Sequence, residues 1–145
     1  MISDIDLIRV LEGTYTIAIV GASNNPTRAS YQVLMELNER GYQIFAVNPA
    51  LEDNKIGSVP RYRSLREIDQ PIDMVDIFRN SEAAADVVDD ILELPVLPKT
   101  IWMQLGVINE IAAEKARAKG IDVVMDRCPK IELLRLGLKG PKSRV

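Results

Sequence analysis

The chain has 145 residues, of which 47% are hydrophobic and 27% are charged, a composition typical of a folded protein rather than a disordered one. The net charge of −3 argues against general nucleic-acid binding, which normally requires a basic excess. The absence of histidine excludes histidine-dependent catalysis, and the single cysteine, Cys128, excludes an intrachain disulfide. No apolar run reaches the roughly 18 residues of a membrane span, and the N-terminus lacks a signal-peptide pattern, so we expect a cytoplasmic protein with no membrane partner.

The first part of the chain predicts a strand–helix–strand unit. Apolar residues at helical spacing indicate a helix over residues 5–11, which we expect to pack on the sheet or to support a dimer. Thr16–Val20 is a short β-rich run, typical of a strand buried on both faces. An apolar stripe predicts a helix from Ser30 that stops at Gly41, and Tyr42–Val47 predicts the second strand. The crossover between the two strands should be right-handed.

The rest of the chain continues the alternation after an irregular stretch. Ser58–Pro60 predicts a very short edge strand, because proline is tolerated there, and Ser64 and Glu67 have the spacing of a capping box. Strands are predicted over 73–78, 100–103 and 121–125, and helices over 81–94, 109–119 and 129–136, the first of them capped by Ser81. The tail at 137–145 is rich in Gly, Pro and Lys, and we expect it to fray.

This alternation predicts an α/β fold with a doubly wound, mainly parallel, Rossmann-like sheet of five to six strands in a three-layer αβα arrangement. We expect one domain over residues 1–145, with its core at about 14–136. Ligands in such sheets bind beyond the carboxyl ends of the strands. The residues that follow Val20, Val47, Phe78, Met103 and Met125 are therefore the candidates for a site.

The loop after the first strand combines a tight turn with small polar groups and one cation. Gly21 supplies the turn and Arg28 the cation, and the polar donors are Ser23, Asn24, Asn25, Thr27 and Ser30. The loop is not a dinucleotide fingerprint, because Ser23 and Pro26 replace the second and third glycines, and it is not a P-loop. These features favour a phosphate site. The alternative is a polar turn capped by Asn25, with Pro26 at the first helical position.

Asn48, at the end of the second strand, bears on the choice of nucleotide. A site for NAD usually has Asp or Glu here, to bind the ribose hydroxyls. A neutral Asn48 together with Arg28 favours a nucleotide with an extra ribose phosphate, CoA or NADP, over NAD. The alternative for Asn48 and Pro49 is a simple strand terminator.

Several motifs occur in the order of a known family. They are Ile19–Ser23, Arg28-x-Ser30-Tyr31, Val47–Pro49, Val75–Arg79, Trp102–Gly106 and Met125–Glu132. Between about Thr14 and Leu136 the chain resembles the small single-domain CoA-binding proteins, which are similar to the CoA-binding domain of the succinyl-CoA synthetase α subunit.

The resemblance implies binding of coenzyme A or an acyl-CoA without established catalysis. By position in the family pattern, the nucleotide phosphates would contact Gly21, Ala22, Ser23, Asn24, Asn25, Arg28 and Ser30. Asn48 would lie near the adenosine, Phe78 and Arg79 would flank the adenine or the pantetheine, and Gln104 and Gly106 would sit beside the pantetheine arm. The chain lacks the second domain and the phosphohistidine of the ligase. We therefore expect a carrier, a sensor or a module for a partner enzyme, without nucleic acid or metal; the alternatives are an NAD(P)-dependent oxidoreductase and a nucleotide-sensing regulatory protein.

Five further features have both a functional and a structural interpretation. Cys128 is either a thiol that forms a mixed disulfide with CoA or a buried small side chain. Asp126, Arg127, Lys130 and Glu132 are interpreted as an ion-pair network rather than a ligand rim. We expect Asp76 to cap a strand end and Trp102 to pack in the core. The basic stretch 61–66 is interpreted as a solvated loop rather than an RNA contact.

Overall fold

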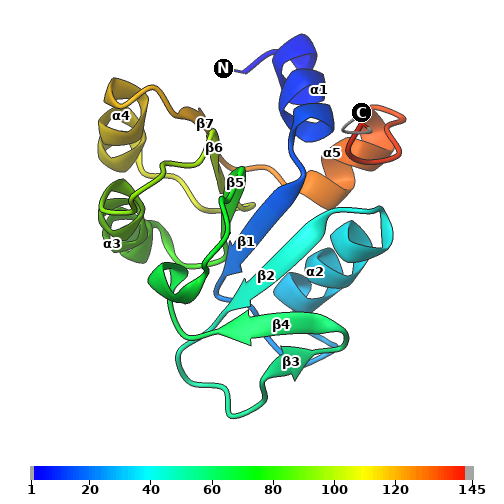
Figure 1. The fold of residues 1–145 in the computed structure, drawn as a ribbon. Helices are drawn as coiled ribbons and strands as arrows, with labels where there is room; N and C mark the ends of the chain where they lie inside the picture. The colour runs from blue at the N-terminus through cyan, green and yellow to red at the C-terminus, as the bar shows by residue number, and fades with distance from the viewer. Residues whose placement is uncertain (1, 143–145) are drawn as a thin grey trace.

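A seven-stranded sheet lies between two layers of helices in the computed structural model, which describes residues 2–142 (Figure 1). The strand order is β3-β4-β2-β1-β5-β6-β7, and every neighbouring pair is parallel except β3–β4. Their bounds are β1 Thr16–Val20, β2 Gln43–Val47, β3 Lys55–Ile56, β4 Val59–Tyr62, β5 Met74–Ile77, β6 Thr100–Met103 and β7 Asp122–Val124. The chain turns from one half of the sheet to the other between β1 and β5, which is where such folds bind ligands.

Five α-helices cover the sheet, three on one face and two on the other (Figure 1). α1 (Asp4–Gly13), α2 (Ala29–Glu39) and α5 (Pro129–Arg135) pack on one face, and α3 (Ser81–Leu92) and α4 (Glu110–Ala118) pack on the other. A single 3-10 turn spans Leu65–Glu67. No helix among residues 2–142 is both long and apolar enough to cross a membrane.

The central strand β1 explains why the sheet needs both helical layers. All five of its residues are buried. Ile17 and Ile19 pack against α1 and α2, whereas Ala18 and Val20 join the core beneath α3 and α4. Because successive side chains of a strand point to opposite faces, a continuous apolar run such as this one is buried only when both faces are covered. The predicted αβα arrangement is confirmed.

The sheet has two more strands than the lower sequence estimate, because β3 and β4 form a small hairpin. The predicted strand at Ser58–Pro60 corresponds to β4, which is not an edge strand. β4 pairs with β2 on one side and with β3 on the other, and the antiparallel register places Lys55 opposite Pro60. A two-residue strand such as β3 has no periodicity of its own, so the sequence could not indicate it.

Two predicted helix caps are wrong. Asn80, not Ser81, caps α3, and its Oδ1 accepts a hydrogen bond from the Ala83 N–H at 2.8 Å. The Ser81 hydroxyl instead accepts from the Ile108 N–H at 3.0 Å, which links α3 to the loop before α4. Ser64 makes no capping hydrogen bond with its side chain.

The predicted fraying of the tail is also wrong as far as residue 142. Arg40 donates to the Leu138 carbonyl at 2.7 Å, and the Lys142 N–H donates to the Glu12 carbonyl at 3.0 Å. Residues 137–142 therefore lie against α1 and α2, while 143–145 fall outside the described residues. The predicted helix at 5–11 packs on the sheet through Leu7 and Leu11.

Candidate functional site

Two cavities border the carboxyl ends of β1, β2 and β5, one on each face of the sheet. The first, here called the α2 cavity, has a volume of about 360 Å³ and is lined by Gly21, Ala22, Ser23, Arg28, Ala29, Ser30, Asn48 and Phe78. The second, the α3 cavity, has about 330 Å³ and is lined by Val20, Val47, Pro49, Arg63, Ser64, Leu65, Arg66, Arg79, Val87 and Asp90. Neighbouring residues such as Phe78 and Arg79 line opposite cavities, so one elongated ligand crossing this edge would contact both.

Gly21 makes the turn that separates the two cavities. Its φ of +87° is strained for any residue with a side chain. A Cβ at this position would stand 2.3 Å from the Phe78 carbonyl oxygen. The Gly21 and Ala22 N–H groups both donate to the Val47 carbonyl, at 3.1 and 3.3 Å. The loop is therefore fixed to the ends of β2 and β5.

Asn48 holds the same loop from the other side. Its Nδ2 donates to the Ala22 carbonyl at 2.8 Å, and its Oδ1 accepts from the Ala50 N–H at 2.7 Å. Asn48 lines the α2 cavity, but its amide is already engaged within the chain. It therefore shapes the loop as well as bordering the cavity.

The remainder of the first loop folds on itself before α2 begins. Asn25 Oδ1 accepts from the Thr27 N–H at 3.0 Å, and Asn24 donates to Asp53 at 3.2 Å. Neither Asn24 nor Asn25 lines the two cavities. The helix begins at Ala29, so Pro26 is not at its first position.

The N-terminus of α2 has no side-chain cap. Its N-cap residue, Arg28, makes no capping hydrogen bond with its side chain. The N–H groups of a helix's first turn have no partners inside the helix, so here they stay available to an anion. Arg28, Ala29 and Ser30 all line the α2 cavity, so these donors border it.

Arginines dominate the charge of the site. Within residues 2–142, the guanidinium groups of Arg28, Arg63 and Arg79 form no ion pair or hydrogen bond, whereas Arg66 pairs with Glu93 at 2.5 Å. Arg63 and Arg66 belong to the basic stretch 61–66, for which the sequence predicts a solvated loop. They lie in the α3 cavity because β4 is a parallel neighbour of β2, so the residues after it reach the same edge.

Two predicted site residues follow β6 and lie outside both cavities. Gln104 is 6% exposed, and its Oε1 has no hydrogen-bond partner among the described residues. Gly106 is exposed, and its N–H donates to Asp126 Oδ1 at 2.7 Å.

Asp76 differs from its predicted role as a strand-end cap. It is completely buried in β5, and neither carboxylate oxygen has a partner among the described residues. Burial raises the pKa of Asp76 well above its ordinary value. The capping carboxylate is instead Asp73, whose Oδ2 accepts from the Tyr15 and Thr16 N–H groups at 2.9 and 3.1 Å.

The residues around the start of α5 have structural roles. Glu132 accepts from Arg127 and from Arg135, the latter at 2.6 Å, so the predicted ion-pair network is present in part. Within residues 2–142, Asp126 and Lys130 form no ion pair, and Arg135 joins Arg127 and Glu132 instead. Trp102 is fully buried and donates to the Arg127 carbonyl at 2.8 Å, which confirms its core role. Cys128 is 5% exposed, so little of its thiol is open to an oxidised CoA.

Comparison with known proteins agrees with this geometry. A family model described as a CoA binding domain matches residues 15–133. The chain is 38% identical over 129 residues to the uncharacterized protein YneT of Bacillus subtilis (strain 168), covering 89% of this chain and 93% of that protein. The cell-free ID.343 structure from Thermus thermophilus has a TM-score of 0.86 at 32% identity, covering 93% and 99% of the two chains. The structure of a hypothetical protein from Pyrococcus horikoshii OT3 has a TM-score of 0.85 at 30% identity, covering 93% of this chain and 92% of that chain.

Proposed function

The chain belongs to the CoA-binding domain family, and from that membership we propose that it binds coenzyme A or an acyl-CoA across the carboxyl ends of β1, β2 and β5. The chain would act as a single CoA-binding domain. The observation that carries the proposal is the pair of cavities on either side of Gly21, each of which contains arginine.

The α2 cavity suits the diphosphate. In our proposal the first-turn N–H groups of α2 and the Arg28 guanidinium bind its oxygens, with Ser23 and Ser30 as further donors. Gly21 and Ala22 allow the close approach, since no side chain larger than a methyl group stands between the backbone and the cavity. Phe78 supplies an apolar wall.

The α3 cavity suits the phosphorylated ribose and the adenine. Arg63 and Arg79 carry unpaired guanidinium groups within the described part of the chain, and these would bind the ribose phosphate. Pro49 and Leu65 would contact the base. Asn24, Asn25, Gln104 and Gly106 lie outside both cavities, so we assign the principal contacts to the residues that line them.

We propose binding rather than catalysis as the role of the site. The sequence has no histidine, and no group of three or more potential metal ligands gathers within residues 2–142. A CoA carrier, a CoA sensor or a module that presents CoA to a partner enzyme needs neither.

Thermal unfolding with a panel of ligands tests the proposal. At a concentration one hundred times its dissociation constant, a ligand adds about 2.7 kcal/mol, which raises the midpoint of a domain this size by roughly 5–10 °C. We expect this shift with CoA and acetyl-CoA, a smaller one with dephospho-CoA, which lacks the ribose phosphate, and none with NAD. A shift with NAD or NADP but not with CoA would favour the oxidoreductase alternative, and no shift with any ligand would refute the proposal.

An arginine variant tests the phosphate assignment. Arg28→Ala should weaken CoA binding in calorimetric titration by about tenfold, because one charge-assisted contact is lost. Lys119→Ala is the matched control, since it removes an exposed positive charge at the end of α4, away from both cavities. Equal affinities for CoA in Arg28→Ala and the wild type would show that the diphosphate lies elsewhere.

A further inference from the structure

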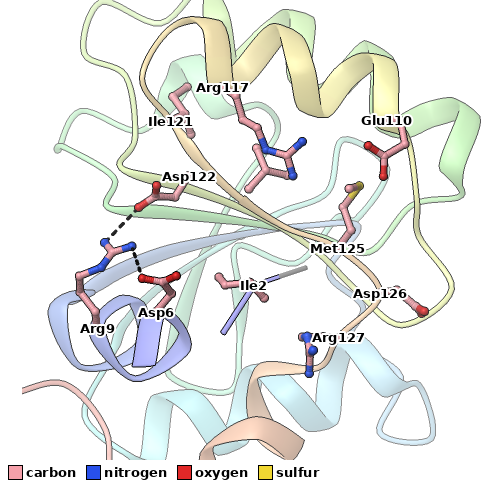
Figure 2. Close-up of a pocket in the computed structure, with 11 residues that line it drawn as sticks. Ile2, Asp6, Arg9, Glu110, Arg117, Ile121, Asp122, Met125, Asp126 and Arg127 are labelled. Atoms are coloured by element: carbon pink, nitrogen blue, oxygen red, sulfur yellow. Dashed lines mark hydrogen bonds and ion pairs between the residues drawn. The ribbon is translucent and has the colours of Figure 1, made fainter. Parts of the chain in front are cut away.

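A groove of about 680 Å³ runs along β7 (Figure 2). We call it the β7 groove. The strand order places β7 at the edge of the sheet, three strands from β1. One wall of the groove comes from α1, through Asp6 and Arg9, and the other from α4, through Glu110 and Arg117. Its floor is β7 itself, together with Ile121 before the strand and Met125 after it, and Ile2 lies in the groove between α1 and Met125.

The floor of the β7 groove is an unpaired strand edge. β7 is the last strand in the sheet order and pairs only with β6. The Asp122 N–H points toward β6, where it donates to the Lys99 carbonyl at 3.0 Å. Because alternate residues of a strand direct their backbone groups to opposite sides, the N–H and C=O of Val123 point into the groove. They are positioned to pair with another strand.

Two opposite charges of α4 lie near opposite ends of the groove. Glu110 and Arg117 are seven residues apart on α4, which separates them by roughly 10 Å along the helix. Arg117 stands near Ile121, at the start of β7, and Glu110 stands near Met125, after its end (Figure 2). Within residues 2–142 neither side chain forms an ion pair.

This pattern favours a second copy of the chain as the occupant. If two β7 strands pair antiparallel about Val123, residues before the centre of one strand meet residues after the centre of the other. Glu110 of each copy then faces Arg117 of the other, so the Glu110–Arg117 ion pair forms twice.

The apolar surface beside the groove is consistent with such an interface. Ile5 on α1 and Ile111 on α4 are 79% and 78% exposed, the highest values among the large apolar side chains of the described residues. Each belongs to a helix that forms a wall of the groove. Helices α1 and α4 of the two copies would approach each other on opposite faces of the joined sheet, which would reduce the exposure of these side chains.

We propose that the protein forms a two-fold symmetric dimer through antiparallel pairing of β7, with reciprocal Glu110–Arg117 ion pairs. The two sheets would become one continuous sheet. The CoA sites would stay open, because β7 lies three strands away from β1. The dimer is thus independent of whether the proposed ligand binds.

A charge swap measured by sedimentation equilibrium tests the dimer. The wild type should have twice the 16.2 kDa mass of one chain. Glu110→Arg alone places two arginines opposite each other at both contacts, and Arg117→Glu alone places two glutamates there. Each should raise the dimer dissociation constant by at least about tenfold. The double variant Glu110→Arg/Arg117→Glu restores the pairs and should recover most of the wild-type affinity.

Glu39→Arg on α2 is the control, since it reverses an exposed charge outside the groove and should leave the dissociation constant unchanged. Thermal unfolding of each variant checks that the fold is intact. A wild type that stays at 16.2 kDa at about 1 mM protein would overturn the proposal. So would a dimer whose affinity is the same in the single variants, because it would use another surface.

Discussion

Gly21 joins the ends of three strands and leaves no space for a side chain. Its N–H donates to the end of β2, and a Cβ would meet the end of β5 at 2.3 Å from the Phe78 oxygen. We expect Gly21→Ala to lower the free energy of unfolding by about 2–4 kcal/mol, because the strained φ and the backbone collision add. CoA affinity should fall with it, since the turn shapes both cavities. Urea unfolding and calorimetric titration measure the two effects.

Gly106→Ala separates the two causes. Gly106 has a similar φ of +81°, but a Cβ there would have no heavy atom within 4 Å. This substitution should cost only about 1–2 kcal/mol, the price of the backbone conformation alone. If Gly21→Ala costs no more than Gly106→Ala, the close approach to Phe78 has no energetic weight.

Asp76 makes the stability of the protein depend on pH. Burial without a hydrogen-bond partner raises the pKa of Asp76 above its ordinary value of 3.8. Above pH 3.8 the unfolded chain loses this proton while the folded chain keeps it, so each pH unit removes up to about 1.4 kcal/mol of stability until the folded-state pKa is reached. Asp76→Asn removes this dependence of stability on pH. We expect the variant to gain stability relative to the wild type as the pH rises from 4 to 8, measured by urea unfolding.

The Asp76→Asn comparison has a clear contrary result. A constant difference between the two proteins across that pH range would mean that Asp76 ionises alike in the folded and the unfolded chain. The sequence does predict the buried position of another side chain, Trp102, in the core. The isolation of Asp76 could not be predicted, because it depends on what faces β5 from other elements.

At the C-terminal end of the fold, Glu132 connects α5 to the rest of the structure. Glu132 is 4% exposed, and its carboxylate accepts from Arg127 and Arg135. Arg135 also donates to Asp4 on α1 at 2.8 Å. Burial opposes ionisation, but the hydrogen bonds from Arg135 and Arg127 outweigh it, so the pKa of Glu132 is lowered from 4.5. The ion pairs therefore stabilise the fold above pH 4.5, and this contribution is lost as the pH falls through the folded-state pKa.

Glu132→Gln should lower the free energy of unfolding by about 2 kcal/mol at pH 7, since among the described residues it leaves Arg127 without a charged partner and leaves Arg135 with only its exposed pair to Asp4. The difference from the wild type should shrink in acid. Glu93→Gln is the matched control: it breaks the exposed pair with Arg66, whose loss should cost less than about 1 kcal/mol. Equal losses in the two variants would show that burial gives the α5 network no special weight. Chemical denaturation at pH 7 and at pH 3 provides the measurement.

Elements whose pattern is local were predictable, and those that depend on a distant partner were not. β1 is a continuous apolar run and α3 has a clear helical periodicity, and the structure has both at the expected positions. β3 exists only because it pairs with β4. The segment at 137–142 has the composition of a loose tail, yet it is ordered by Arg40 and Glu12, about a hundred residues earlier.

The two cavities of the candidate site differ in the same way: the sequence predicts one of them locally, and the other depends on a distant element. The α2 cavity is formed by residues that follow β1, β2 and β5. Because ligands of such sheets bind beyond the carboxyl ends of the strands, the sequence indicated most of its lining. The α3 cavity also needs Arg63 and Arg66, which follow β4. Without the hairpin that places β4 inside the sheet, these arginines have no visible relation to Arg28 in the sequence.

Across the whole molecule, positive charge gathers where the proposed ligand binds although the net charge is −3. Arg28, Arg63, Arg66 and Arg79 line the two cavities, so the rest of the chain has a larger acidic excess. A polyanion as long as a nucleic acid would meet that acidic surface, whereas CoA spans only the carboxyl edge of the sheet. The arrangement thus favours a small anionic ligand.

The proposed arginine contacts make CoA binding sensitive to salt. Raising the ionic strength from about 0.01 M to about 1 M shortens the screening length from about 30 Å to about 3 Å, which weakens attraction between the exposed guanidinium groups and the phosphates. We expect the affinity for CoA to fall by about tenfold or more. The slope against salt should be shallower for dephospho-CoA, which lacks the roughly two negative charges of the ribose phosphate, and for Arg28→Ala, which removes one positive charge. Calorimetric titration in a series of NaCl concentrations gives the slopes. Binding that does not change with salt would mean that apolar contacts, not the arginines, hold the coenzyme.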